Sequence, residues 1–466
     1  MIGRLTLMLA ALLLGTKPAL TQSGASTVIP DECRFLTQGN LTDLKKRMAK
    51  LEAEVTRQLA LAVGQRSNAA KHDPQVMPAS TDDLRRNQEE LLQLVFQIDC
   101  LERGKKLPPI ASRSRAAARE SVGPAAGSSG ESARRPTDAY EVPIYYATNR
   151  NRTGDEQPTK LYGSDFAQDF AHHYGRVVVT IPRTHVAGNI ELPSLWKLET
   201  NVDPSKHFVL KSVAPLETSA ARAEMSAKLA NLPKKALLVF VHGYNTSFAD
   251  AALRTAQMAH DIDFTGLPFF YSWPSAGKAF SYWQDEEAAL SSEEAFERLV
   301  FELSELPASD IYIVAHSMGN RIASRALSRI AERSAVVPHV RELLLAAPDI
   351  NAELFRNQIA PKLVSMQGLR TTVYASSTDL ALVASKFVHG FHRVGETSGG
   401  VKPYFGLDMI DASAASLLTR SYGHSYVVDS PQVIKDIRSI VLDNLPTIRR
   451  HLQPAGAAPN NYWRLP

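Results

Sequence analysis

Residues 310–320 read DIYIVAHSMGN, an apolar run that meets His316 and Ser317 and then turns polar. A short, continuous apolar run is typical of a strand buried on both faces, and the periodic polar residues that follow indicate a helix. A strand-to-helix turn sharp enough to expose a serine hydroxyl requires small residues two before and two after the serine. Ala315 and Gly319 satisfy this steric requirement, although glycine is the usual residue at the first position. The stretch therefore predicts Ser317 as a nucleophile, with a serine that caps a helix as the alternative interpretation.

From about residue 138 onward, strand-like and helix-like segments alternate along the chain. The predicted strands begin at Glu141, Gly175 and His207 and continue with 236–241, 267–273, 310–315, 340–347 and 369–376. The later strands are separated by predicted helices at about 247–263, 291–306, 318–332 and 351–359. Short apolar strands that alternate with helices imply a mostly parallel, doubly wound α/β sheet. In such a sheet the ligand binds at the carboxyl ends of the strands, so the residues after each strand are the candidates for chemistry.

His242 and Gly243 directly follow the predicted strand at 236–241. A glycine there allows a tight backbone turn, so that a following main-chain N–H can point into the site as half of an oxyanion hole. A plain strand-to-helix turn is the alternative, because a His-Gly pair alone is weak evidence.

A serine nucleophile needs a base and an orienting carboxylate, and in this type of sheet the chain order is serine, acid, histidine. Asp379 follows the last predicted strand and opens a helix-like stretch, which favours it as the acid over Asp349, one strand earlier. Among the later histidines, His389 and His392 lie too near Asp379 for a separate loop to return over the site. His424 stands before the final helix-like stretch and is the predicted base.

Residues 1–25 have the pattern of a secretory signal peptide. Arg4 precedes an apolar run from Leu5 to Leu14, and Pro18 and small residues follow. The run has roughly half the length that a helix needs to cross a bilayer, so no stable membrane span is expected. We therefore expect an exported bacterial protein, periplasmic or secreted, with an N-terminal core helix as the alternative interpretation.

Residues 31–103 predict two amphipathic helices joined by a loop with Pro74 and Pro78. Their apolar residues recur at steps of three and four, as in a coiled coil. An antiparallel hairpin of these helices brings the chain's two cysteines, Cys33 and Cys100, together, which predicts a disulfide in an oxidising compartment. Two unpaired thiols are the alternative. The hairpin is suited to be a spacer, a self-association element or a partner-binding arm.

Residues 104–137 are rich in Ala, Gly, Ser, Pro and Arg without hydrophobic periodicity, which is typical of a flexible linker. We expect a catalytic domain at 138–450 and a tail at 451–466. The formal net charge of +4 over 466 residues is too small to indicate binding to nucleic acid or to a membrane surface. The net charge therefore does not indicate a class of binding partner.

Several motifs, in a fixed order, resemble one family of proteins. They are HGYN, FYSWPSAG with a downstream YWQDEEAA, AHSMGNR, LLLAAPDI, VYASSTD and GHSY. EVPIYYATNR and YGRVVVTIPRTHVAGNIELP resemble the N-terminal extension of the same family. This is a bacterial, esterase- or lipase-like α/β-hydrolase family of unknown function, and the resemblance covers roughly residues 139–445. It implies an α/β-hydrolase fold, preceded here by the helical hairpin, which the resemblance does not cover.

Applied to this sequence, the resemblance implies Ser317 as nucleophile, Asp379 as acid and His424 as base. It also implies that Tyr244 and Met318 supply the main-chain N–H groups of an oxyanion hole. The residues expected to support the elbow and the adjoining loop are His242, Gly243, His316 and Gly319. No metal or organic cofactor is implied, because the histidines form no cluster with ligand-type spacing.

The expected reaction is two-step acyl transfer on a small-molecule or lipid-like acyl substrate. A carboxylester is the default substrate, while a thioester, an amide and transfer to an acceptor other than water stay open. The aromatic residues of FFYSWPS and FSYW belong either to an acyl pocket or to the core. The alternative function is a catalytically silent binding or scaffold protein that acts through the hairpin, although the intact Ser, Asp and His set argues against it.

Overall fold

A computed structural model describes residues 139–168, 171–193, 202–277, 281–333, 339–417 and 424–466, and five single positions between 43 and 54. The chain divides into two compact units, Thr16–Thr137 and Asp138–Pro466 with Met1–Gly15. The predicted signal peptide, hairpin, Cys33–Cys100 disulfide and linker lie outside the described residues. The exceptions are five positions in the first predicted hairpin helix, all helical: Asp43, Lys46, Arg47, Lys50 and Glu54.

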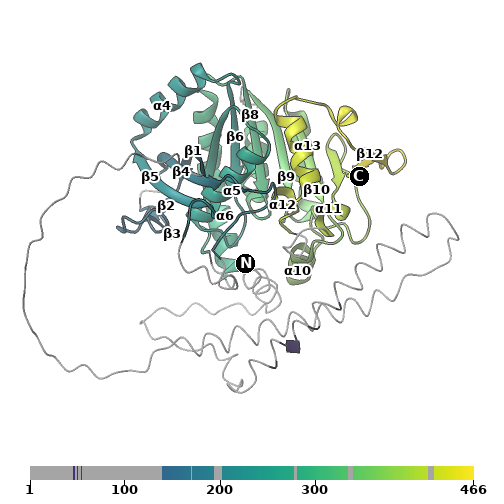
Figure 1. Ribbon diagram of the computed structural model, residues 1–466. Helices are drawn as coiled ribbons and strands as arrows, with labels where there is room; N and C mark the ends of the chain where they lie inside the picture. Colours follow the sequence, from purple (N-terminus) through teal and green to yellow (C-terminus); the bar gives the residue numbers. More distant parts are fainter. Residues whose placement is uncertain are drawn as a thin grey trace, which may run out of the picture. The chain divides into compact units, whose positions relative to one another are not determined.

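One large sheet forms the centre of the described part of the second unit (Figure 1). Its strand order is β12-β13-β11-β10-β9-β8-β6-β7-β1-β4-β5. Each neighbouring pair from β13 to β1 is parallel, whereas β4, β5 and β12 are antiparallel additions at the two edges. A separate hairpin consists of β2 (Arg150–Arg152) and β3 (Tyr162–Phe166). The strands of the large sheet are β1 (Ala139–Thr148), β4 (His173–Pro182), β5 (Val209–Leu216), β6 (Ala236–Val241), β7 (Leu267–Ser272), β8 (Asp310–His316), β9 (Val340–Ala346), β10 (Arg370–Ala375), β11 (Asp408–Asp411), β12 (Gln453–Ala455) and β13 (Tyr462–Arg464).

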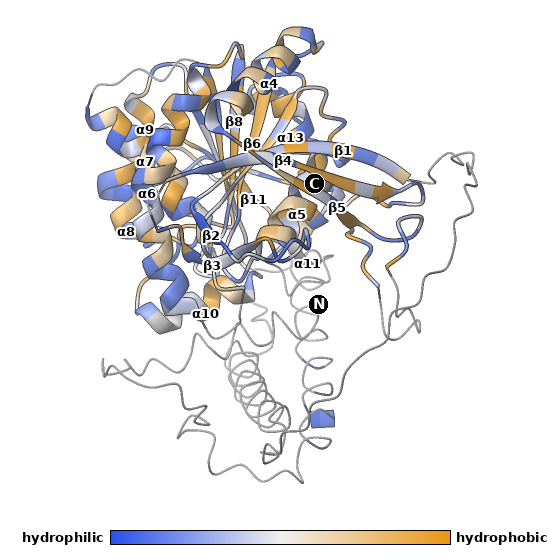
Figure 2. Cartoon of the chain, turned by 90° about the vertical axis from the view of Figure 1, so that its left-hand side faces the viewer, coloured by the Kyte–Doolittle hydropathy of each residue, from blue (hydrophilic) through white to orange (hydrophobic). Residues whose placement is uncertain are grey.

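Helices cover both faces of this sheet. Figure 2 shows α6, α7 and α9 on one side and α5 and α13 on the other; α7 contacts both α6 and α9, and α12 contacts both α5 and α13. None of the described helices has the length and apolar character needed to cross a bilayer. The helices are α4 (Thr218–Asn231), α5 (Phe248–Asp261), α6 (Tyr282–Ser304), α7 (Gly319–Glu332), α8 (Ala352–Leu354), η4 (Phe355–Ile359), α9 (Ala360–Ser365), α10 (Leu380–His389), α11 (Ser413–Leu417), α12 (Tyr426–Asp429), α13 (Pro431–Val441) and η5 (Thr447–Arg449).

The central strands explain the continuous apolar runs of the sequence. All six side chains of β6 are buried, and β8 and β9 are buried over most of their length, because helices pack on both faces. The chain runs from β6 to β7 on one side and then to β8 on the other side of β6. The order of the strands therefore reverses beside β6. Ligands of doubly wound sheets bind in the crevice at such a point.

The predicted α/β architecture is confirmed. The eight predicted strands correspond to β1 and β4 to β10, with ends within three residues of the prediction. Helix α6 begins at Tyr282, nine residues before the predicted start, because its first two turns combine aromatic and acidic residues that hide the helical period. Helix α4 and the short strands β3, β11, β12 and β13 were not predicted.

The end of the chain differs from the expected tail at 451–466. Strand β13 pairs with β11, and β12 pairs with β13, so these residues extend the sheet beyond position 450. Leu465 is buried and Trp463 packs against the core. Strands of three residues are too short for a hydrophobic pattern to reveal them, and they form because the sheet edge offers backbone partners.

The aromatic residues of FFYSWPS and FSYW belong mainly to the core. Trp283, on α6, is 45% exposed, and the second segment's Phe280 lies outside the described residues. The buried members are Phe269, Phe270, Tyr271, Trp273 and Tyr282.

Candidate active site

Ser317 stands at the turn between β8 and α7. Its backbone has a φ of 53°, a left-handed conformation that is unfavourable for a residue with a side chain. The Ser317 N–H donates to Ala346 O at 3.0 Å, and Ser317 O accepts from Asn320 Nδ2 at 2.8 Å. Asn320 Nδ2 also donates to Ala346 O at 2.9 Å. These hydrogen bonds hold the strained turn against the end of β9.

Two glycines allow the neighbouring chain to approach this turn. A Cβ atom at Gly319 would lie 2.3 Å from His242 O, so α7 packs against the end of β6 only with glycine there. A Cβ atom at Gly243 would lie 2.8 Å from the Ser317 Cβ. The loop after β6 therefore passes directly beside the serine, and Ala315 is buried below it.

The loop after β6 continues with Tyr244 and Asn245. Asn245 has a φ of 54°, and its N–H donates to Asp285 Oδ2 at 3.0 Å. Met318 lies immediately before the first residue of α7, where N–H groups have no partner within the helix. Gly243 lies close to Ser317, so Tyr244 follows a residue that adjoins the serine, and Met318 follows the serine itself.

Asp285 fixes this loop, and the sequence analysis did not identify it. Its carboxylate accepts from Asn245 N–H, from Ser275 Oγ at 2.5 Å and from Ala276 N–H at 2.7 Å. The side chain is fully buried, and burial raises the pKa of the carboxyl group, although these hydrogen bonds work against the rise. The available signal was an acidic residue in the YWQDEEAA motif, but its partners come from loops that meet only in the folded chain.

His242 supports the same loops as a neutral side chain. Its ring stacks on Trp273 with centroids 4.9 Å apart, and Trp273 Nε1 donates to His242 O at 2.8 Å. Burial and the nearby Arg150 guanidinium hold the pKa of His242 well below its ordinary value. His242 is therefore suited to bracing the loop and not to accepting a proton.

Asp379 and His424 form a buried pair. Asp379 caps the N-terminus of α10, and its Oδ1 accepts from Leu382 N–H at 3.1 Å. His424 Nδ1 lies 2.8 Å from Asp379 Oδ2, so the imidazole donates its Nδ1 proton to the carboxylate. Burial disfavours the imidazolium, but the charge and hydrogen bond of Asp379 outweigh this effect and raise the pKa of His424. The carboxylate thus fixes the ring and stabilises its protonated form.

His424 lies next to the serine elbow. Its ring centroid is 4.9 Å from that of His316, the residue before Ser317, and His316 Nε2 lies 3.1 Å from His424 O. Burial and the proximity of His424 lower the pKa of His316 to about 3, so His316 is neutral. Ser317 Oγ and His424 Nε2 are both buried, and neither has a hydrogen-bond partner within the described part of the chain. Catalytic hydrogen bonds are often unformed without substrate.

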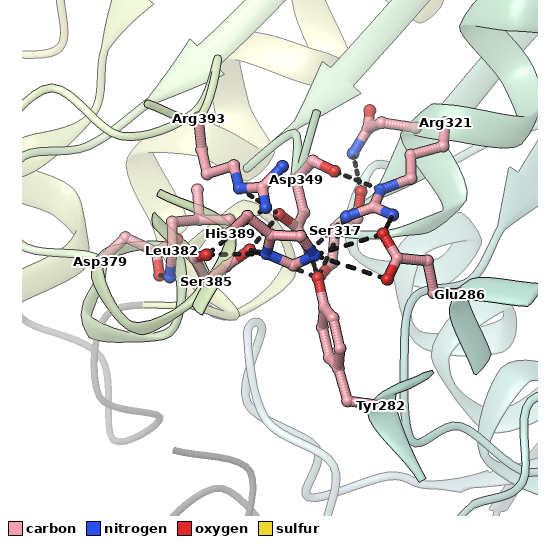
Figure 3. A network of polar contacts seen from close by, with 11 residues as sticks. Tyr282, Glu286, Ser317, Arg321, Asp349, Asp379, Leu382, Ser385, His389 and Arg393 are labelled. Carbon is pink, nitrogen blue, oxygen red and sulfur yellow. Dashed lines mark hydrogen bonds and ion pairs between the residues drawn. The ribbon is translucent and has the colours of Figure 1, made fainter. Parts of the chain in front are cut away.

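The side chains of the other candidate acid and histidines are paired with other groups. Asp349 pairs with Arg321 and Arg393 in a buried cluster (Figure 3). His389 Nε2 lies 3.2 Å from Glu286, and His392 Nδ1 lies 3.4 Å from Glu396. Asp379 is therefore the candidate carboxylate that is hydrogen-bonded to His424.

A cavity of about 510 Å³ opens beside Ser247, which follows the loop after β6. It does not include Ser317, Asp379 or His424, so its size alone does not mark the chemical site. It is lined by the β2–β3 hairpin and by Ser247, Ser275 and Ala276. No group of three or more His, Cys, Asp or Glu side chains among the described residues is arranged to hold a metal ion.

The mostly parallel sheet and the serine on a strand-to-helix elbow define an α/β-hydrolase fold. Residues 217–441 match the family model described as "Alpha/beta hydrolase of unknown function (DUF900)". The matched residues include every candidate site residue from His242 to His424. No curated protein sequence matches the chain.

Several solved esterase structures are similar to the chain at low identity. A thermostable esterase from Pseudomonas putida ECU1011 is 9% identical, with a TM-score of 0.28 over 66% of this chain and 81% of the esterase. An esterase from Pyrobaculum calidifontis is 10% identical, with a TM-score of 0.25 over 58% and 82%. Rhizomucor miehei esterase is 10% identical, with a TM-score of 0.28 over 66% and 85%. At these TM-scores the similarity carries no argument about the site.

Proposed function

We propose that this α/β-hydrolase is a serine hydrolase that cleaves an ester-type bond through an acyl-enzyme. The observation that carries the proposal is the state of His424. Its Nδ1 is bound to Asp379, while its Nε2 and Ser317 Oγ are both buried beside the elbow without a hydrogen-bond partner among the described residues. Burying two polar atoms without hydrogen bonds costs stability, and groups of this kind are typically retained where they serve a function.

In the proposed first step, His424 Nε2 accepts the Ser317 proton as Oγ attacks the carbonyl carbon of the substrate. The main-chain N–H groups of Tyr244 and Met318 stabilise the negative charge on the carbonyl oxygen. The imidazolium then gives its proton to the leaving alcohol, which departs and leaves an ester on Ser317. Asp379 keeps the ring oriented and stabilises its positive charge throughout.

In the second step, His424 takes a proton from water as the water oxygen attacks the acyl carbon. The second tetrahedral intermediate collapses, Oγ recovers its proton from His424, and the free acid leaves. We propose a carboxylester of a small or lipid-like molecule as the substrate. Thioester or amide cleavage, and transfer of the acyl group to another acceptor, use the same groups.

We also propose that the protein is exported, on the basis of the signal-type pattern at residues 1–25. Detection of the mature chain outside the cytoplasm, with a new N-terminus near residue 25, supports this part of the proposal. A chain that stays in the cytoplasm with an intact N-terminus contradicts it.

Labelling with a fluorophosphonate probe tests the serine hydrolase. The wild-type protein is expected to become labelled and Ser317→Ala to stay unlabelled, because the probe reacts with an activated serine. Ser291→Ala, an exposed serine on α6, is the control and should label as the wild type does. Equal labelling of wild type and Ser317→Ala contradicts the proposal and favours a catalytically silent binding protein. A series of esters with increasing acyl length then defines the substrate.

A further inference from the structure

Asp349, at the end of the segment after β9, is a buried carboxylate with an unusual set of partners. Its side chain is 2% exposed. Arg393 Nε lies 3.3 Å from Oδ1, and Arg321 Nη2 lies 3.4 Å from Oδ2. Tyr282 and Ser385 each donate a hydroxyl hydrogen bond to the carboxylate at 2.6 Å. Burial favours the neutral acid, but the two guanidinium groups outweigh it and hold the pKa of Asp349 well below its ordinary value.

The main chain of Asp349 is bound to the nucleophile elbow. Its N–H donates to Ser317 O at 3.3 Å, and its carbonyl accepts from Arg321 Nε at 2.6 Å. Arg321 lies on the first turn of α7, the helix that begins directly after the elbow. Both the backbone and the carboxylate of Asp349 therefore hold the start of α7.

The side chain of Asp349 is also bound to the helix that carries the proposed acid. Ser385 lies on α10, and α10 begins directly after Asp379. Figure 3 shows Ser385 and Arg393 on one side of Asp349 and Arg321 and Tyr282 on the other. A buried ion pair adds little stability over apolar residues of the same size, so stability alone does not account for this arrangement.

We propose that Asp349 is a positioning residue for the reaction, which holds the Ser317 elbow against the Asp379-bearing helix α10 and stabilises the His424 imidazolium with its charge. The inference rests on the proposed serine hydrolase activity. It assigns Asp349 a role beside Asp379 and not in place of it.

The charges around Asp349 and His424 set the expected pH dependence of the reaction. Asp379 and Asp349 act on His424 as negative charges, and His316 faces it as a neutral ring. Arg321 and Arg393 face Asp349, and behind Arg321 lies Glu286, which also contacts His389. Removing the negative charge of Asp349 leaves the two arginines unbalanced. The His424 pKa should then fall. The acid limb of the pH–rate profile, where the rate rises as His424 loses its proton, should therefore move to lower pH.

The rate constant of fluorophosphonate labelling, measured across acid and neutral pH, tests the inference without a known substrate. For Asp349→Asn we expect the plateau rate to fall about tenfold, because the elbow and α10 lose their common anchor. We expect the acid limb to move to lower pH by roughly half a unit. Asp436→Asn is the matched control, since Asp436 also accepts from a tyrosine hydroxyl, at 2.8 Å from Tyr374, and pairs with Arg450.

A second variant separates the two parts of the role and covers the case in which Asp349→Asn does not fold. Ser385→Ala keeps every charge and removes the hydrogen bond between α10 and Asp349, so the plateau should fall a few-fold with the acid limb unmoved. If Asp349→Asn folds and keeps the wild-type plateau and limb, or if Ser385→Ala keeps the wild-type plateau, the inference is overturned. An unlabelled wild-type protein instead overturns the proposed function.

Discussion

Ser317 holds a left-handed backbone that costs about 1–2 kcal/mol for a residue with a side chain. The hydrogen bonds of its N–H and carbonyl with Ala346 and Asn320 offset this cost. Strain of this kind persists only where the surroundings over-determine the conformation, and such positions cluster at functional sites. In this fold the strained turn directs the chain sharply from β8 into α7 and places Ser317 directly after His316, whose ring packs beside that of His424.

Asp379→Asn separates the two candidate acids at the level of single residues. The amide can present its NH₂ group to His424 Nδ1, which favours the tautomer with its proton on Nε2, and that tautomer cannot accept the serine proton. The labelling rate at neutral pH should fall roughly 10³- to 10⁴-fold. The labelling rate should fall far more in Asp379→Asn than in Asp349→Asn. A larger fall in Asp349→Asn would indicate that Asp349 is the acid.

The pH profile of the same variant gives a second readout. His424 must be neutral to act as a base, so the wild-type rate should rise with pH through the raised His424 pKa. Without the Asp379 charge this pKa falls, and the acid limb of the residual activity should move to lower pH. If the acid limb of the pH–rate profile stayed at the wild-type pH, a group other than His424 would control it.

The proposed triad could be predicted from sequence because the serine, acid and histidine follow a fixed chain order and each follows a strand or precedes a helix. The roles of Asp285 and Arg321 could not be predicted from the sequence. Their partners lie on loops and helices distant in sequence, such as Asn245 for Asp285 and Asp349 for Arg321. A contact between distant loops is set by tertiary packing, which a pattern within one short segment does not contain.

Helix α6 is the element that orders the proposed oxyanion loop. Its first turns, which the sequence analysis left out of the helix, carry Tyr282, Asp285 and Glu286. Asp285 binds the loops after β6 and β7, whereas Tyr282 and Glu286 bind the cluster around Asp349 and Arg321. The N-terminal part of one helix thus connects the loop after β6 with the α7 and α10 side of the site.

Asp285→Asn tests this role of α6. Donors approach both carboxylate oxygens, so an amide must turn its NH₂ group toward at least one N–H or O–H donor, at a cost of about 1–3 kcal/mol. We expect the labelling rate to fall roughly 100-fold as the Tyr244 amide moves, with a lower Tm. Glu287→Gln, an exposed neighbour on α6, should change neither. A lower Tm with a wild-type labelling rate would limit Asp285 to a structural role.

At the scale of the whole molecule, the strands from β10 to β5 were predictable, whereas the edge formed by β11, β13 and β12 was not. Strands such as β6 and β8 are buried on both faces, so their burial appears as unbroken apolar runs in the sequence. Strands β11, β12 and β13 have three or four residues each, and their pairing depends on the neighbouring edge. The edge strands extend the sheet, while the candidate site lies at the ends of the central ones.

A chain that starts at Asp138 tests whether the second unit contains the whole activity. The core of the described residues runs from Ile144 to Leu465, and every proposed catalytic group lies between these two positions. A unit of this size can bury enough apolar surface to fold without the preceding residues. We expect a single cooperative unfolding transition and a labelling rate within about twofold of the full-length chain, because the reacting groups and their anchors are retained. Aggregation, or a labelling rate more than about tenfold lower, would show that residues before Asp138 contribute to the stability or to the site of the hydrolase unit.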